Sequence, residues 1–188
     1  TMSSLAIDGL RYALQTGGQG APILLLHGFT GRGSDWARLV PVLRRTHRTI
    51  AVDLPGHGRS EAPADPARHG LERIAADLAT LLRTLGAVPA AVLGYSMGAR
   101  VALRLALDAP GVVERLVLES PSAGIADPAE RARRRARDEA LARLLERDGI
   151  AAFVDAWQAQ PLFASQAALR PSVRATVRRR RLANRPAG

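Results

Sequence analysis

Short, uninterrupted apolar runs recur along the first two thirds of the chain, and each is bounded by turn-forming residues. Such runs are typical of strands that are buried on both faces of a parallel sheet. A loosely alternating segment at 5–14 precedes them and ends in a Gly-rich turn, which predicts one peripheral strand. The pattern therefore predicts five strands, at 5–14, 22–26, 49–52, 90–93 and 116–118.

Segments between these runs carry apolar residues at helical spacing. Helices are predicted at 34–44, 71–85 and 97–107. Ser34 and Gly70 stand at two of the expected starts, and Gly86 follows one of the expected ends. Strands that alternate with helices in this way indicate an α/β fold, with a mostly parallel sheet and helices on both of its faces.

The pattern changes after residue 126, where no further strand is predicted. Helices are expected at 128–148, around 151–157 and at 171–182, with a break at 161–163. We therefore expect an N-terminal part of an α/β core at 1–126 and a helical cap at 127–188. The cap is expected over the carboxyl edge of the sheet, where open α/β sheets bind ligands.

Composition excludes several classes of function. The chain has no cysteine, so disulfides, thiolate metal sites and thiol nucleophiles are excluded. No apolar run is long enough for a membrane span, and no basic-then-apolar leader opens the chain, so we expect a cytoplasmic protein. The net charge of +10 comes from arginine alone and is concentrated toward the C-terminal end, but no aromatic residue lies among the arginines of 170–185. That pattern argues against a nucleic-acid partner.

One sequence motif indicates a catalytic residue. Residues 94–98 read Gly-Tyr-Ser-Met-Gly and lie between a predicted strand and a predicted helix, which is the context that a G-x-S-x-G nucleophile elbow requires. The serine of such an elbow sits in a strained turn, with its hydroxyl exposed at the positive end of a helix. The sequence therefore predicts Ser96 as the catalytic serine.

Two loops that follow other strands add to the site. The loop His27-Gly28-Phe29 is expected to supply one backbone N–H of an oxyanion hole from Phe29, and Met97 the other. His27 is expected to be a structural histidine that bonds to the local backbone. His57 lies in a tight loop after an earlier strand, so an architectural role is expected for it, with catalytic base as the alternative.

The motifs His-Gly-Phe, Asp-Leu-Pro-Gly-His-Gly-Arg-Ser and Gly-Tyr-Ser-Met-Gly, in this order and spacing, resemble the α/β-hydrolase superfamily. A narrower resemblance is to the 2-succinyl-6-hydroxy-2,4-cyclohexadiene-1-carboxylate synthases of menaquinone biosynthesis. It rests on residues 27–31, 94–98, 119–121, 133–138, 161–165 and 181–184, together with Arg100 and Trp157.

This resemblance implies a lyase. A serine in a triad with histidine and aspartate abstracts a proton, and pyruvate leaves by cleavage of a C–O bond, without cofactor or metal. The substrate is a small polycarboxylate, and guanidinium groups bind carboxylates in bidentate fashion. The resemblance assigns its carboxylates to Arg100, Arg134 and Arg181, and the pocket lining to Tyr95 and Trp157. If the match to the family is shifted by one helical turn within these arginine-rich segments, Arg131, Arg137 or Arg178 would take the place of Arg134 or Arg181.

The chain departs from the family in its histidines. Triads on this fold run in the order serine, acid, histidine, whereas all four histidines here precede Ser96. We therefore expect an incomplete chain that is inactive alone, with an unpaired sheet edge that lowers solubility or pairs with another chain. The alternatives are a carboxylesterase or carbon–carbon bond hydrolase of the same fold, and a non-catalytic binding module without a triad. The oligomeric state stays open.

Overall fold

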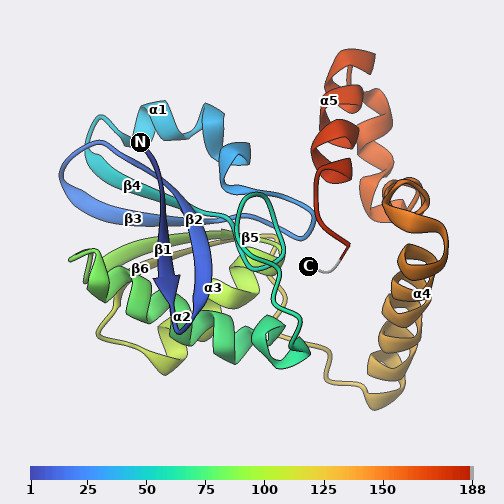
Figure 1. Cartoon of the computed structure of the whole chain (residues 1–188), viewed down its shortest axis with the longest axis horizontal. Coiled ribbons are helices and arrows are strands. Elements are labelled where there is room, and N and C mark those ends of the chain that lie inside the picture. The colour runs from blue at the N-terminus through green and yellow to red at the C-terminus, as the bar shows by residue number, and fades with distance from the viewer. Residues whose placement is uncertain (187–188) are drawn as a thin grey trace. The chain divides into compact units, whose positions relative to one another are not determined.

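The computed structural model describes residues 1–186, which form two compact units: a sheet unit, Thr1–Ala123, and a helical unit, Gly124–Pro186. The sheet unit holds six strands in the order β1-β2-β4-β3-β5-β6 (Figure 1). Their bounds are β1 Met2–Ile7, β2 Leu10–Gly17, β3 Ala21–Leu26, β4 His47–Val52, β5 Ala90–Tyr95 and β6 Val113–Glu119. The pairs β3/β4, β3/β5 and β5/β6 are parallel, so the predicted mostly parallel sheet is confirmed.

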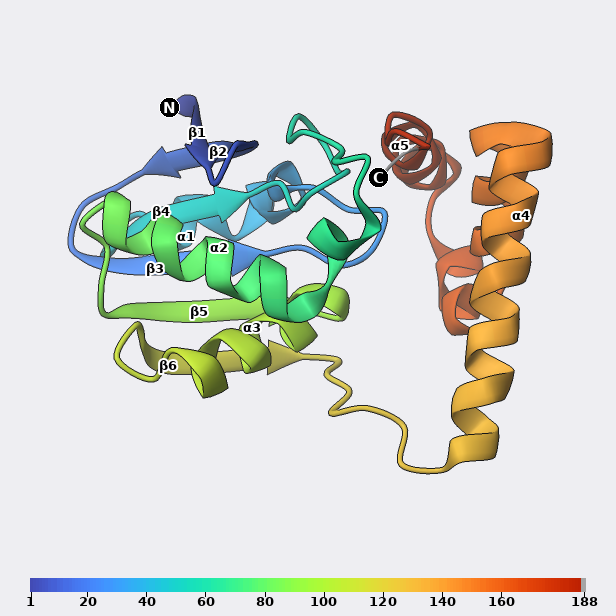
Figure 2. The same cartoon turned by 60° about the horizontal axis from the view of Figure 1, so that its bottom comes forward.

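Both faces of the central strands are buried. Leu24 and Leu26 of β3 join the main core against α2 (Leu71–Thr84) and α3 (Met97–Asp108). Ile23 and Leu25 point to the opposite face, where Trp36 packs on them. Figure 2 shows α2 and α3 on one side of the sheet and α1 on the other. This two-sided burial is the physical reason for the uninterrupted apolar runs, and the predicted helices on both faces are confirmed.

The prediction of a single strand at 5–14 is wrong. The chain folds there into a hairpin, with β1 antiparallel to β2 and Ile7 opposite Leu10. Asp8 and Gly9 form its turn and have φ values of 46° and 75°. Asp-Gly favours this left-handed conformation, and a two-residue turn of this kind matches the twist of paired strands. The sheet therefore has six strands rather than the five expected.

The predicted helix at 34–44 is also wrong in form. The chain makes a 3₁₀ helix, η1 (Gly33–Arg38), and then a single helical turn, α1 (Val40–Leu43). Pro41 has no N–H to donate and its ring clashes with the preceding turn, so a continuous helix would break there. The helix start is likewise corrected, because the N-cap is Arg32 rather than Ser34. By contrast, the predicted N-cap Gly70 of α2 is confirmed.

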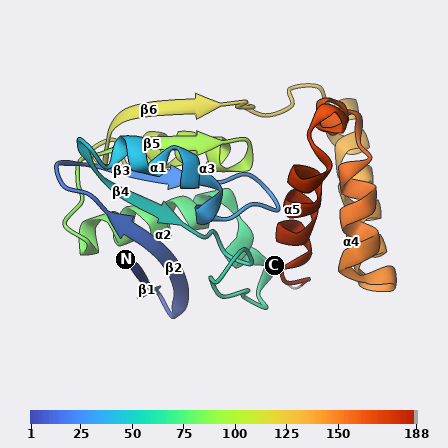
Figure 3. The same ribbon diagram turned by 90° about the horizontal axis from the view of Figure 1, so that it is seen from above.

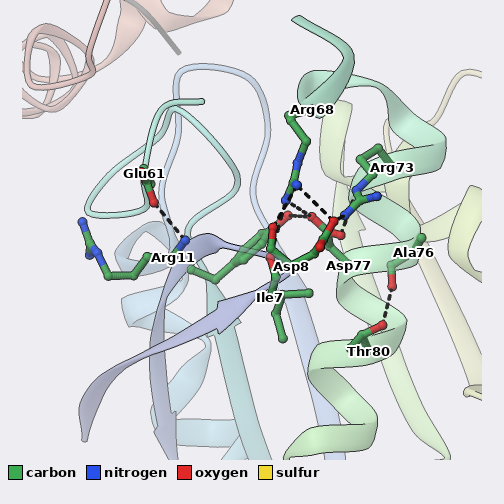
Figure 4. Close-up of polar contacts among 10 residues, drawn as sticks. Ile7, Asp8, Arg11, Glu61, Arg68, Arg73, Ala76, Asp77 and Thr80 are labelled. Carbon is green, nitrogen blue, oxygen red and sulfur yellow. Dashed lines mark hydrogen bonds and ion pairs between the residues drawn. The ribbon is translucent and has the colours of Figure 1, made fainter. Parts of the chain in front are cut away.

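A cluster of polar side chains ties the N-terminal hairpin to α2 (Figure 4). Tyr12 of β2 donates its hydroxyl hydrogen to Asp77 of α2 at 2.8 Å, and both side chains are buried. Arg68 and Arg73 each form an ion pair with Asp77, at 3.2 and 3.1 Å, and both also contact Asp8 in the hairpin turn. Burial and the neighbouring Asp77 raise the pKa of Tyr12 above its ordinary value, so the phenol stays protonated and donates.

The helical unit consists of α4 (Pro128–Gln158), the 3₁₀ helix η3 (Pro161–Ala168) and α5 (Pro171–Leu182). The helices predicted at 128–148 and 151–157 are joined in α4 across a kink at Gly149, whose φ is 81°. The break predicted at 161–163 is instead the start of η3. The prediction for α5 is confirmed. Residues 187–188 of the expected cap lie outside the described residues.

Side-chain contacts form both within and between the helices of this unit. Trp157 stacks on Phe153 within α4, with ring centroids 6.3 Å apart. Arg178 of α5 forms a bidentate pair with Asp155 of α4, at 2.9 and 3.1 Å. Figure 3 shows α4 and α5 side by side.

Candidate active site

Ser96 stands at the sharp turn from β5 into α3. Its φ of 53° and ψ of −110° place a side-chain-bearing residue in a strained region of backbone space. Such strain costs roughly 1–3 kcal/mol and persists only where surrounding contacts enforce it. Here the Ser96 N–H donates to Glu119 O at 2.9 Å, and Ser96 O accepts from the N–H groups of Ala99 and Arg100 at 3.1 and 3.2 Å. The turn is therefore fixed from both β6 and α3.

The two glycines of the motif are required by close backbone approach. A Cβ on Gly98 would lie 2.5 Å from His27 O and would collide with Leu26 O at the end of β3. A Cβ on Gly94 would lie 2.7 Å from Ala99 Cα. Any side chain at either position would push the elbow away from the sheet. The spacing of G-x-S-x-G thus follows from how tightly α3 passes the strand ends.

The loop after β3 lies against the elbow. A Cβ added to Gly28 would meet the Tyr95 ring at 2.8 Å and Ser96 Cβ at 3.4 Å. Phe29, the next residue, has a half-exposed side chain at 40%. The structure thus brings the loop of Phe29 beside the start of α3, which contains Met97. Their role as oxyanion donors stays a prediction.

His27 is held by the backbone on both ring nitrogens. Nδ1 lies 2.8 Å from Gly28 O, which can only accept, and Nε2 lies 2.9 Å from the N–H of Leu54, which can only donate. The ring is therefore neutral, with its proton on Nδ1. Burial, helped by the neighbouring His57, lowers the pKa of His27 to about 3. A buried ring with both nitrogens engaged does not serve as a catalytic base.

His57 also belongs to the loop architecture. Its Nδ1 donates to Pro55 O at 2.9 Å, and its ring meets Phe29 edge-on with centroids 5.7 Å apart. Burial lowers the pKa of His57 as well. Within residues 1–186, no histidine forms a hydrogen bond with Ser96.

Asp53 is a buried carboxylate that sequence reasoning did not single out. It accepts the N–H groups of Gly33 and Arg59, at 2.6 and 2.8 Å, and so joins the loops that follow β3 and β4. Gly58 packs directly on the carboxylate, which leaves no room for a side chain at that position. The sequence did contain a signal for this role, because Asp53 is an acidic residue directly after a buried strand and before a Gly-rich loop.

Two of the predicted substrate-binding residues lie on the elbow itself. Tyr95 is 39% exposed at the end of β5, and Arg100 is exposed on the first turn of α3, four residues after Ser96. Residues three or four apart on a helix share a face. In the part of the chain that the structure describes, no ion pair engages the Arg100 guanidinium.

The other three predicted substrate-binding residues lie in the helical unit. Phe163 brings two of them together: its ring centroid is 5.5 Å from that of Trp157, and the guanidinium of Arg181 lies 4.6 Å over it. Arg181 is buried. Arg134 is not part of this cluster, because it is exposed near the start of α4 and pairs with Asp138 at 2.8 Å. Sequence reasoning did not assign the joining role of Phe163.

Two of the arginines considered as substitutes have structural partners. Arg131 donates to Ile125 O and Ala126 O, both at 2.7 Å, and Arg178 pairs with Asp155. Among the described residues, no three His, Asp or Glu side chains gather closely enough to bind a metal ion. The same residues contain no helix that is long and apolar enough to cross a membrane.

Known proteins resemble this chain along most of its length. A family described as "alpha/beta hydrolase fold" matches residues 21–183. The "Putative 2-succinyl-6-hydroxy-2,4-cyclohexadiene-1-carboxylate synthase" of Bacillus subtilis is 38% identical over 190 residues, which cover 100% of this chain and 69% of that protein. A 2-succinyl-6-hydroxy-2,4-cyclohexadiene-1-carboxylate synthase of Klebsiella pneumoniae is 33% identical, over 83% of this chain and 61% of its own length.

Solved structures show the same similarity as the sequence comparisons. MenH from Staphylococcus aureus superimposes with a TM-score of 0.85 at 31% identity, over 94% of this chain and 66% of that chain. A hydrolase from Pseudomonas aeruginosa gives 0.84 at 29% identity, over 100% of this chain and 69% of its own. This chain therefore spans about two thirds of the length of these relatives. It belongs to the α/β-hydrolase fold family and, within it, is related to the 2-succinyl-6-hydroxy-2,4-cyclohexadiene-1-carboxylate synthases.

Proposed function

We propose that Ser96 is the proton-abstracting base of a lyase that eliminates pyruvate from 2-succinyl-5-enolpyruvyl-6-hydroxy-3-cyclohexene-1-carboxylate. The product is 2-succinyl-6-hydroxy-2,4-cyclohexadiene-1-carboxylate. The observation that carries the proposal is the strained elbow at Ser96, with Gly28 packed against it, in a chain 38% identical to the Bacillus subtilis "Putative 2-succinyl-6-hydroxy-2,4-cyclohexadiene-1-carboxylate synthase". Tyr95 and Arg100 are the proposed substrate contacts of the sheet unit. For Arg134, Trp157 and Arg181 of the helical unit, substrate binding stays a prediction.

The chemistry suits this arrangement. The proton leaves C2 of the ring, which is next to the succinyl carbonyl. Its electrons form the C2–C3 double bond, the C3–C4 double bond moves to C4–C5, and the C5–O bond breaks. The released enolpyruvate takes up a proton to become pyruvate. Negative charge develops on the carbonyl oxygen, and this charge is what the N–H groups of Phe29 and Met97 would stabilise.

A serine hydroxyl needs a partner to act as a base. On this fold the partner is a histidine that follows the serine in sequence, and none of residues 97–188 is a histidine. His27 and His57 are buried, and their pKa values are lowered. The activity is therefore proposed for the full-length gene product, with a histidine that these residues do not supply.

A time course of pyruvate release from the full-length gene product and this substrate tests the proposal. Ser96→Ala should reduce the rate by about 10³-fold or more, because the remaining groups of a triad do little alone. Ser3→Ala, on the exposed surface of β1, is the matched control and should leave the rate unchanged. Absence of pyruvate from a folded wild-type protein would contradict the proposal.

The second candidate is a serine hydrolase of esters or carbon–carbon bonds. The likeness to the Pseudomonas aeruginosa hydrolase favours it, since an elbow serine and an oxyanion hole also serve acyl transfer. Turnover of a small p-nitrophenyl ester distinguishes the two. Rapid Ser96-dependent hydrolysis without pyruvate release would favour the hydrolase.

A further inference from the structure

The peptide group between Gly28 and Phe29 is fixed through its carbonyl oxygen. Gly28 O accepts one hydrogen bond from His27 Nδ1 at 2.8 Å and another from the N–H of Gly31 at 2.9 Å. This peptide bond is trans. In a trans peptide the C=O and the N–H point in opposite directions. Fixing Gly28 O therefore also fixes the direction of the Phe29 N–H.

His27 is itself anchored to the loop that follows a different strand, β4. Its Nε2 accepts the N–H of Leu54, two residues beyond the end of β4, at 2.9 Å. Its ring is 2% exposed and lies 5.2 Å from the ring of His57, which in turn packs on Phe29. The imidazole is thus a rigid bridge from the chain after β4 to the loop after β3.

We propose that His27 is a positioning residue for the oxyanion hole: its Nδ1–H holds the Gly28 carbonyl so that the Phe29 N–H stays directed at the developing negative charge. The inference rests on the proposed function of Ser96 and deepens it. It is supported by the position of the loop, because a Cβ on Gly28 would be 3.4 Å from Ser96 Cβ. Hydrogen-bond donors stabilise such charge only when they are oriented in advance.

Two isosteric variants separate the two hydrogen bonds of His27. In His27→Asn the amide NH₂ takes the place of Nδ1–H, so the bond to Gly28 O is kept and the acceptor for Leu54 is lost. In His27→Gln the longer side chain places its amide near the position of Nε2, so an acceptor for Leu54 is available and the donor to Gly28 O is lost. A purely structural histidine would not distinguish these two variants in kcat.

The measurement is kcat and KM for pyruvate release by the full-length protein. His27→Gln should lower kcat by about 10- to 100-fold with KM within about twofold, since an oxyanion donor acts on the transition state. His27→Asn should keep kcat within about threefold of wild type. Equal losses in both variants, or a loss confined to KM, would overturn the inference. If His27→Gln does not fold, the test uses His27→Asn only. A decrease of more than about tenfold in the kcat of His27→Asn then overturns the inference.

Phenylboronic acid provides a readout that does not depend on the lyase reaction. It adds to a serine hydroxyl and places a boronate oxygen in the oxyanion hole, and ¹¹B NMR reports its affinity. If the wild type binds it through Ser96 but releases no pyruvate, the proposed function fails and the inference is judged on affinity. Weaker binding by His27→Gln than by His27→Asn supports the inference. Equal binding by the two variants, or no Ser96-dependent binding by the wild type, overturns it.

Discussion

Gly98 shows how strongly a single residue constrains the elbow. Because its Cα faces the carbonyl groups at the end of β3, a methyl group has no space. Gly98→Ala should therefore lower the free energy of unfolding by about 1–3 kcal/mol, as overpacking in a rigid core does. Gly111→Ala is the matched control, because a Cβ there meets nothing within 4 Å, and its effect should stay within about 0.5 kcal/mol. Urea denaturation of both variants tests this, and equal losses would contradict it.

His27 gives stability a defined pH dependence. Its pKa falls from 6.5 in the unfolded chain to about 3 in the folded one, so between these values only the unfolded state binds the proton. The free energy of unfolding is thus fully maintained above pH 6.5 and decreases as pH falls toward 3, by about 1.4 kcal/mol per pH unit. His27→Gln should show a shallower decrease between pH 6 and pH 4 in urea titrations. Parallel curves for the two proteins would refute this assignment.

Residue-level predictions succeeded where the signal was local. The elbow turn at Ser96 and the structural character of His27 are visible in short motifs, because steric demands and turn chemistry act over a few residues. The bridging role of Asp53 was not predicted, since its partners Gly33 and Arg59 belong to two loops that meet only in the folded sheet. Phe163 was missed for a related reason: its contact with Arg181 depends on the packing of η3 against α5.

Elements were predicted well where one pattern continued without a breaker. The bounds of α5 were predicted as observed, and the apolar runs located the buried strands, although β4 begins two residues before its run and β5 ends two residues after its run. The hairpin of β1 and β2 was merged into one strand because Asp8-Gly9 interrupts an otherwise weak alternation. The helix at 34–44 was overextended because apolar spacing alone carries no information about Pro41. In both cases a turn-forming or helix-breaking residue determined the local structure, although the spacing of apolar residues predicted a continuous element.

The polar cluster around Asp77 is an element-scale feature, because it joins the hairpin to α2. Tyr12→Phe removes a hydrogen bond to a buried carboxylate and should lower the free energy of unfolding by about 2 kcal/mol. Asp8→Asn is the control: this side chain is 66% exposed, so loss of its charge should cost under about 1 kcal/mol. Thermal or urea unfolding of the two variants measures the difference. A larger effect from Asp8→Asn would show that the exposed pairs dominate.

Hydrophobic burial is distributed unequally over the molecule. Among residues 1–186, all buried hydrophobic side chains except Phe153 and Val154 lie in the sheet unit. Since burial of apolar area is the main stabilising contribution, the helical unit should unfold at lower urea concentration than the sheet unit. Hydrogen exchange measured by mass spectrometry should show α4 and α5 losing protection first, while β3 and β5 remain protected. Simultaneous loss in both units would indicate one cooperative structure.

The two tryptophans divide evenly between the units, with Trp36 packed on the sheet and Trp157 stacked on Phe153. Trp157→Phe therefore leaves an indole emitter only in the sheet unit, and Trp36→Phe leaves one only in the helical unit. A chain without cysteine or lysine offers neither a thiol nor an ε-amine for a dye. Its intrinsic fluorescence nevertheless reports on each half separately, and the aromatic packing that stabilises each unit also provides its spectroscopic probe.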